Sequence, residues 1–167
     1  MLDTKTLLPS PKSAMLSVCC DRLRLRPIVS RLAPLSDNGE MELKILLIDD
    51  EEMICDLLGS MLSLSFDVQT TCSAREGLGL FSREHFDLVM TDLKMAEMSG
   101  EQVATEIRQL RSDQPIVFMS GHVDSATDQS LREYAPQILL EKPFPHRKEV
   151  VEILNRFAKE NAIERAS

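Results

Sequence analysis

Residues 43–50, Leu-Lys-Ile-Leu-Leu-Ile-Asp-Asp, join a short apolar run to two adjacent acids, and this stretch decides the fold. Two later apolar runs end in the same way, because 86–91 leads to Asp92 and 138–141 leads to Lys142. Parallel strands present their C-terminal ends on one edge of a sheet. The sequence therefore predicts one shared site at that edge, where closely packed carboxylates need a divalent cation to offset their repulsion.

Strand-like and helix-like segments alternate regularly after this stretch. The apolar runs lie at 43–48, 66–71, 86–91, 115–119 and 137–141, and helical periodicity lies at about 51–64, 74–84, 100–111, 123–134 and 146–161. Five strands alternating with five helices predict an α/β fold, a doubly wound five-stranded parallel sheet with helices on both faces. The helices are amphipathic. In the third, Val103, Ile107 and Leu110 recur at helical spacing, which predicts that they face the core.

The first 40 residues of the 167-residue chain differ from the rest. They hold four prolines and no sustained periodicity, which predicts a disordered or extraneous N-terminal arm over 1–40. Two alternatives are a true start at Met41 and an arm that docks on a partner. We expect one domain over 41–161 and a tail over 162–167, which is too short for an output module, so the domain is expected to stand alone.

Charge and composition exclude several functional classes. The net charge is −8, and because residues 1–40 carry six Lys/Arg and four Asp/Glu, residues 41–167 carry −10. An acidic domain with few aromatic residues argues against direct nucleic-acid binding, by phosphate neutralisation or by base stacking. No apolar run approaches the roughly 20 residues that span a bilayer. We therefore expect a cytoplasmic protein with no membrane contact.

The four cysteines lack the spacing of metal ligands. They are Cys19, Cys20, Cys55 and Cys72. We expect reduced thiols, with Cys55 and Cys72 buried.

The acids at the strand ends point to chemistry on a phosphoryl group. One acid would suffice to cap the helix that follows, yet Asp49 and Asp50 are both present. Both could bind a hard cation such as Mg²⁺. Asp92 taken alone is more often a turn residue. A carboxylate attacks phosphorus only where a metal and an ammonium group offset the charge on the phosphoryl oxygens, and Lys142 would supply the ammonium. Ser120, after the run 115–119, is either a turn residue or a hydroxyl donor to an arriving phosphoryl group.

Together these residues resemble a response-regulator receiver domain of two-component signalling. The acidic pair, the strand-end aspartate, the serine and Lys-Pro-Phe occur in order and with the spacing of that family, over about 43–161. The resemblance implies a flavodoxin-like (βα)5 fold with bound Mg²⁺. It also implies a role for each site residue: Asp92 as phospho-acceptor and metal ligand, Asp50 as direct Mg²⁺ ligand, Asp49 as a ligand acting largely through water, the Lys94 backbone carbonyl as a further ligand, Ser120 as switch hydroxyl, Lys142 as phosphoryl-binding lysine, and Lys142–Pro143 as a candidate cis peptide bond.

Two positions depart from the family pattern. Leu139 stands where the family usually has a Tyr or Phe that rotates on activation, which puts the aromatic form of the switch in doubt. Met95-Ala96 stands where the family usually has Met-Pro. Lys94 and His122 occupy the variable positions with which the family tunes loss of the phosphoryl group.

The resemblance implies a phospho-accepting signalling switch, similar to chemotaxis-type and hybrid-kinase receivers. A histidine kinase or histidine phosphotransfer protein would phosphorylate Asp92, and residues 123–161 would contact a downstream protein target. The chain would not be an enzyme, apart from catalysing its own phosphorylation and dephosphorylation.

Three other classes of protein share some of these features. A pseudo-receiver that binds partners without phosphorylation is the main alternative. A Mg²⁺-dependent phosphohydrolase needs an acid two residues after the nucleophile, where this chain has Lys94. A flavin carrier needs a phosphate-cradling loop, whereas Asp49 and Asp50 would repel the FMN phosphate.

Overall fold

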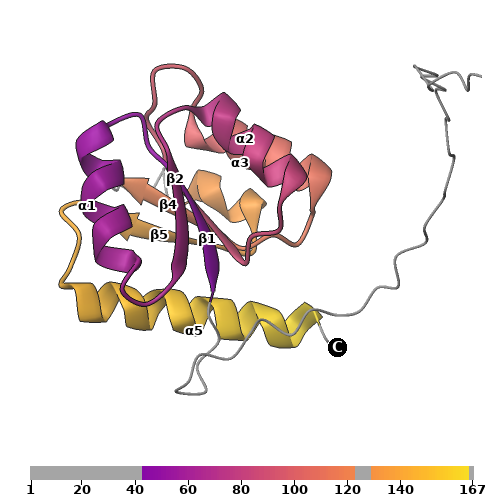
Figure 1. The fold of residues 1–167 in the computed structure, drawn as a ribbon. Helices are drawn as coiled ribbons and strands as arrows, with labels where there is room; N and C mark the ends of the chain where they lie inside the picture. Colours follow the sequence, from indigo (N-terminus) through magenta and orange to yellow (C-terminus); the bar gives the residue numbers. More distant parts are fainter. Residues whose placement is uncertain (1–42, 123–128, 166–167) are drawn as a thin grey trace, which may run out of the picture. The chain divides into compact units, whose positions relative to one another are not determined.

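The computed structural model describes residues 43–122 and 129–165, which form a parallel α/β sheet domain (Figure 1). The elements are β1 (Lys44–Ile48), α1 (Glu52–Leu62), β2 (Asp67–Thr71), α2 (Ala74–Arg83), β3 (Leu88–Asp92), α3 (Gly100–Leu110), β4 (Ile116–Ser120), the 3-10 helix η1 (Arg132–Tyr134), β5 (Gln137–Glu141) and α5 (Arg147–Arg165). All five strands pair in parallel, in the order β2-β1-β3-β4-β5. The predicted fold class is confirmed.

The predicted segments at 1–40 and 123–134 fall wholly or partly outside these residues. The predicted N-terminal arm over 1–40 lies outside the described residues. Of the fourth predicted helix, residues 129–131 are helical and η1 follows.

The sheet is covered on both faces, because neighbouring residues of a strand point in opposite directions. Ile45 and Leu47 of β1 pack into a core with α1 and α5, whereas Leu46 and Ile48 pack into a second core with α2 and α3. Figure 1 shows the same division, with α1 and α5 on one side of the sheet. The central strands β1, β3 and β4 are almost wholly buried, which explains their continuous apolar character.

The strand order places a crevice at the C-terminal edge of the sheet. In the sheet, β2 lies on one side of β1 and β3 lies on the other. The connections that leave β1 and β3 therefore run in opposite directions, and the loops after these strands diverge. Open α/β sheets bind ligands at such a point. Asp49 follows β1 directly and Asp92 is the last residue of β3, so both acids lie at this crevice.

Local signals fix where the helices begin. The Ser73 side chain accepts a hydrogen bond from the Glu76 backbone at the start of α2. Ser99 and Gln102 form a reciprocal capping box at the start of α3. The last helix differs from the prediction at its other end, since α5 continues to Arg165 rather than ending at 161.

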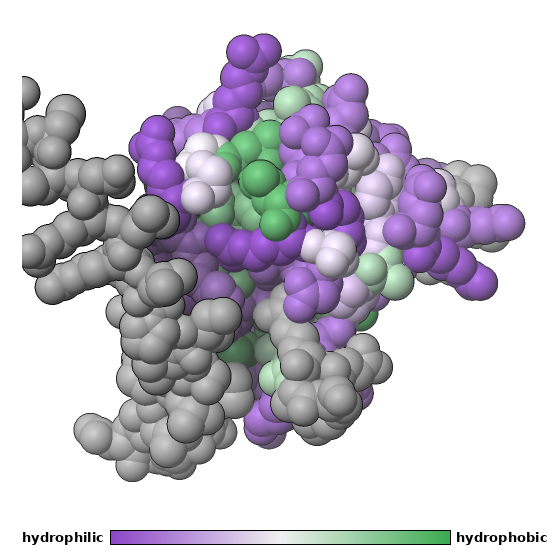
Figure 2. Space-filling model, turned by 90° about the vertical axis from the view of Figure 1, so that its right-hand side faces the viewer, coloured by the Kyte–Doolittle hydropathy of each residue, from purple (hydrophilic) through white to green (hydrophobic). Residues whose placement is uncertain are grey.

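The surface is mostly hydrophilic, with some exposed apolar side chains (Figure 2). In the view of Figure 2, hydrophilic residues surround one compact apolar patch. Among the residues that the structure describes, the exposed large hydrophobic ones are Met53, Leu57, Leu64 and Leu110. Leu110 was predicted to face the core and does not, because it is the last residue of α3. Cys72 is also exposed, contrary to the prediction, whereas Cys55 is buried. Within 43–122 and 129–165, no helix has the length and apolar character to cross a membrane.

Candidate functional site

Lys142 joins the ends of β1 and β3 across the crevice. Its Nζ lies 2.8 Å from Oδ2 of Asp49 and 2.7 Å from Oδ1 of Asp92. The Asp49 side chain is fully buried, and that of Asp92 is 9% exposed. Three residues that lie 43 and 50 positions apart in sequence are thus in direct contact, as the pattern of charged strand ends predicted. The Lys142–Pro143 peptide bond is cis.

The ammonium group of Lys142 is held in its charged form. Burial alone lowers the pKa of a lysine, but hydrogen bonds to Asp49 and Asp92 outweigh it and raise the pKa of Lys142 above its ordinary value. The lysine therefore stays charged throughout the physiological pH range.

Asp49 and Asp50 are adjacent in sequence but differ in their surroundings. Asp49 points inward, where its Oδ1 also accepts a hydrogen bond of 3.0 Å from the Glu51 backbone. Asp50 is exposed, and its Oδ2 accepts a hydrogen bond of 2.7 Å from the backbone N–H of Ala96. A proline has no N–H to donate, so the unusual Ala96 makes this contact possible. Asp50 is thereby tied to the loop after β3.

The loop after β3 fixes the orientation of Asp92. The Lys94 backbone N–H donates a hydrogen bond of 2.6 Å to Oδ2 of Asp92. Gly100, the first residue of α3, packs on the backbone of Asp92 so closely that an added Cβ would overlap the Asp92 carbonyl oxygen and lie 3.1 Å from Cα of Leu93. The glycine therefore lets α3 begin directly against the site.

Ser120 ends β4 beside Lys142, but its hydroxyl is turned toward its own loop. The hydroxyl donates to the His122 carbonyl at 2.7 Å and accepts from the His122 N–H at 3.2 Å. The Ser120 carbonyl accepts a hydrogen bond of 2.7 Å from the Lys142 backbone. Ser120 is thus buried next to the site, with its side chain bonded to His122.

The acidic edge suits a hard divalent cation by its donor chemistry. Three carboxylates (Asp49, Asp50 and Asp92) against one ammonium group leave two negative charges, which one divalent cation offsets. Among the described residues, no three His, Cys, Asp or Glu side chains form a ready-made metal cage. Mg²⁺ does not need one, because it keeps several waters and is often bound by one or two carboxylates.

Glu97 and Tyr134 make contacts that were not anticipated from the sequence. Glu97, in the loop after β3, accepts a hydrogen bond of 3.0 Å from Ser73 and pairs with Arg75 at 2.7 Å, which ties that loop to the start of α2. Tyr134, at the end of η1, packs edge-to-face on Phe118 of β4 with 5.8 Å between ring centroids. Leu139 is half-buried and joins the same apolar cluster.

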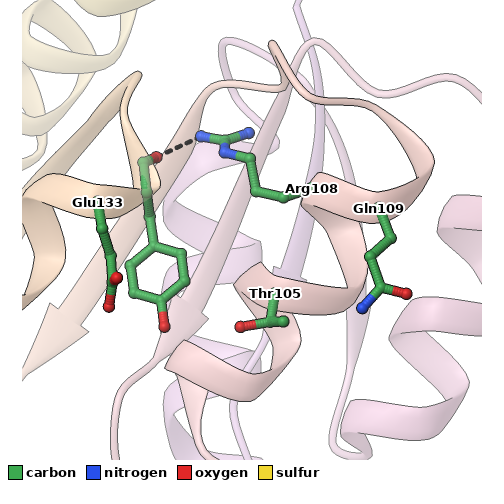
Figure 3. Close-up of a pocket in the computed structure, with 5 residues that line it drawn as sticks. Thr105, Arg108, Gln109 and Glu133 are labelled. Carbon is green, nitrogen blue, oxygen red and sulfur yellow. Dashed lines mark hydrogen bonds between the residues drawn. The ribbon is translucent and has the colours of Figure 1, made fainter.

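A separate open pocket lies between α3 and η1, away from the predicted site residues (Figure 3). Thr105, Arg108, Gln109, Glu133 and Tyr134 line it. The Arg108 guanidinium donates to the backbone carbonyls of Gln114, Tyr134 and Pro136, so it joins α3 to the segment before β5. This arginine serves the fold rather than the acidic edge.

Comparison with protein families identifies a shared domain. The model of the response regulator receiver domain matches residues 45–155. The transcriptional regulatory protein GlrR of Escherichia coli (strain K12) is 39% identical over 79 residues, which cover 47% of this chain and 18% of that protein. The cell cycle response regulator CtrA of Brucella ovis is 30% identical over 110 residues, which cover 65% of this chain and 47% of that protein. The chain thus matches less than half the length of these two regulators.

Solved structures show the same fold. A CheY-like receiver domain protein from Methanospirillum hungatei JF-1 superposes with a TM-score of 0.67 at 22% identity, covering 73% of this chain and 98% of that one. A receiver domain protein from Clostridium thermocellum superposes with a TM-score of 0.63 at 27% identity, covering 74% and 97%.

Proposed function

The chain belongs to the response regulator receiver domain family, and we propose that it acts as a phospho-accepting switch in which Asp92 takes a phosphoryl group. The observation that carries this proposal is the contact of Lys142 with both Asp49 and Asp92. A lone aspartate would be a poor nucleophile toward a phosphoryl anion, because like charges repel. The paired ammonium group removes that obstacle.

The donor would be a phosphohistidine on a histidine kinase or a histidine phosphotransfer protein. One Asp92 oxygen forms the bond to phosphorus as the bond from phosphorus to the histidine nitrogen breaks, and the imidazole leaves. The Lys94 N–H holds the Asp92 carboxylate in place, and Lys142 lies within reach of a phosphoryl oxygen. No separate substrate is turned over in this scheme, because the chain catalyses only its own phosphorylation and dephosphorylation.

Mg²⁺ would be held by Asp50, Asp49, Asp92 and the Lys94 backbone carbonyl. When bound, this cation neutralises charge on the phosphoryl oxygens. Asp50 is the exposed member of the acidic pair and so is the first to meet a hydrated ion. A cation at the Oδ2 oxygen would compete with the Ala96 N–H for the lone pairs of that oxygen.

The signal would leave the site through Ser120. Its hydroxyl exchanges the hydrogen bond with His122 for one to a phosphoryl oxygen, which moves the loop that precedes residues 123–134. A two-state shift biased by one modification then alters how residues 123–161 bind a downstream protein. We place this switch in the cytoplasm, acting through protein contacts and not through direct contact with nucleic acid.

Incubation with acetyl phosphate and Mg²⁺, followed by intact mass measurement, tests the proposal. We expect the gain of one phosphoryl group, its loss in Asp92→Asn and its retention in Asp56→Asn, a matched change of an exposed acid on α1. Omitting Mg²⁺ should abolish the gain in the wild type and in Asp56→Asn. A chain that stays unmodified with Mg²⁺ present, or a gain that survives Asp92→Asn, would favour the pseudo-receiver alternative or another acceptor.

A further inference from the structure

Two thiols meet where α1 begins and β2 ends, beside the acidic edge. The buried Cys55 donates its S–H to the Asp49 carbonyl at 3.2 Å and to the Thr71 carbonyl at 3.5 Å. The Thr71 carbonyl belongs to the peptide group that continues into Cys72, which is exposed. Burial, and after it the neighbouring Cys72 thiol, raises the pKa of Cys55 to about 12. Both cysteines are free in the structure.

The packing of α1 on β2 brings the two cysteines close. One helical turn after Cys55, Gly59 lies so near β2 that an added Cβ would be 2.9 Å from the Cγ2 atom of Thr70. Residues four apart share one face of a helix, and residues two apart share one face of a strand. The same spacing along both elements places Cys72 opposite Cys55 at the end of β2, where Cys55 also reaches the Thr71 carbonyl and the two thiols interact.

We propose that Cys55 and Cys72 form a reversible disulfide when the protein meets a peroxide. The exposed Cys72 reacts first: its thiolate attacks one peroxide oxygen, the O–O bond breaks, and a sulfenic acid and hydroxide result. The Cys55 sulfur then attacks the sulfenic sulfur, the S–S bond forms and the S–O bond breaks. The leaving hydroxide takes the Cys55 proton, so two thiols and one hydrogen peroxide give one disulfide and two waters. A cellular thiol reverses the reaction by exchange.

Oxidation at this position changes the acidic edge. The disulfide removes the S–H that donates to the Asp49 carbonyl and ties the first turn of α1 to the end of β2. Asp49 in turn bonds Lys142, so its position matters for phosphorylation of Asp92. The oxidised chain accepts a phosphoryl group several-fold more slowly than the reduced one, a consequence that rests on the proposed function.

Peptide mapping tests the disulfide without reference to phosphorylation. Full-length protein carrying Cys19→Ser and Cys20→Ser is treated with hydrogen peroxide, digested without reductant and analysed by mass spectrometry. We expect a peptide pair linked through Cys55 and Cys72, which disappears on reduction and is absent from Cys72→Ser. Cys72→Ser changes an exposed residue, so folding is retained, and circular dichroism checks this. Only higher oxides of Cys72, or only links between chains, would overturn the proposal.

The rate of phosphorylation by acetyl phosphate tests the consequence. Peroxide should lower the phosphorylation rate of the protein that has both Cys55 and Cys72, and dithiothreitol should restore that rate. Neither reagent should change the phosphorylation rate of the Cys72→Ser variant. An unchanged rate with the cross-link present would overturn the coupling to Asp92. If the reduced chain is not phosphorylated at all, the proposed function fails, and the mapping result still decides the disulfide.

Discussion

The acidic edge and the β4–β5 side of the sheet are held together by different kinds of contact. At the acidic edge, Asp49 and Asp92 are buried and both bond the ammonium group of Lys142. The β4–β5 side is the part of the sheet formed by these two strands and covered by η1. Here Leu139 is half-buried, and the Tyr134 ring packs on Phe118. Buried ion pairs are costly to break, whereas a ring pair contributes about 0.5 to 1.5 kcal/mol.

This difference separates the part that must stay fixed from the part that can move. Phosphoryl transfer needs reacting groups in a constant geometry, and the acidic edge provides it. A signal needs a region with two accessible arrangements, and weak contacts allow that. Variants that disturb one region and leave the other intact test the separation.

Replacing Lys142 with Met should have the largest effect on stability. Asp49 and Asp92 would then be left buried without a cation, and breaking a buried pair in this way costs about 3 kcal/mol. Urea unfolding measures the loss, and added Mg²⁺ should recover part of it. Lys148→Met is the control, because Lys148 is exposed and lies 4.0 Å from Glu152, and its change should cost well under 1 kcal/mol.

The pH dependence of Lys142 gives a second measurement on the same variant. Its pKa is raised in the folded state, so its contribution to stability is complete below the ordinary lysine pKa of about 10.4. The contribution falls as the pH rises through the higher folded pKa. The stability difference between the wild type and Lys142→Met should therefore shrink only at strongly alkaline pH. A difference that is already lost near pH 8 would contradict this account.

Gly100→Ala should have the next largest effect, about 2 kcal/mol of lost stability. The new Cβ would overlap the Asp92 carbonyl, and forcing atoms into a packed site costs about 1 to 3 kcal/mol. Phosphorylation by acetyl phosphate should slow in parallel, because Asp92 must shift. Gly79→Ala is the matched control in α2, where an added Cβ meets nothing within 4 Å. That change should be neutral or stabilising by about 0.5 kcal/mol.

The sequence predicted the acidic edge better than the β4–β5 side. Continuous apolar runs mark buried parallel strands, and charged residues at their ends identify the edge where they meet, so Asp49, Asp92 and Lys142 were placed together correctly. The direction of a hydroxyl depends on which acceptor lies nearest in three dimensions, so the bond from Ser120 to His122 had no signal in the sequence.

The sequence pattern also did not predict the exposure of Leu110 and Cys72. Apolar periodicity tells which residues share a helix face, but not how far the covering element extends, so Leu110 at the end of α3 was assigned wrongly to the core. The same reasoning misplaced Cys72, which directly follows the last residue of β2. Glu97, in the loop after β3, pairs with Arg75 of α2. Periodicity relates residues within one element, so it could not predict a contact between these two segments.

Ala96→Pro should have a smaller effect, on metal affinity. Proline removes the N–H that bonds Asp50, which frees the carboxylate for Mg²⁺. A hydrogen bond to an exposed charge is worth about 1 kcal/mol, so Mg²⁺ should bind roughly five-fold more tightly. Isothermal titration calorimetry measures this on the unphosphorylated protein. Ala96→Ser keeps the N–H and should bind Mg²⁺ like the wild type; an equal gain in both variants would show that the N–H does not compete.

Tyr134→Leu should have the smallest effect on stability. It tests most directly whether the acidic edge and the β4–β5 side act separately. Leucine keeps much of the apolar contact but loses the edge-to-face pairing with Phe118, which costs about 0.5 to 1 kcal/mol. Phosphorylation of Asp92 should keep its wild-type rate, because the Tyr134 ring packs on Phe118, whereas Asp92 is held by Lys142. Partner binding by the phosphorylated form should weaken, since the ring pair joins β4, which ends in Ser120, to the segment before β5. Equal slowing of phosphorylation would show that the two regions are rigidly coupled, and the separation of a fixed site from a movable output side would then fail.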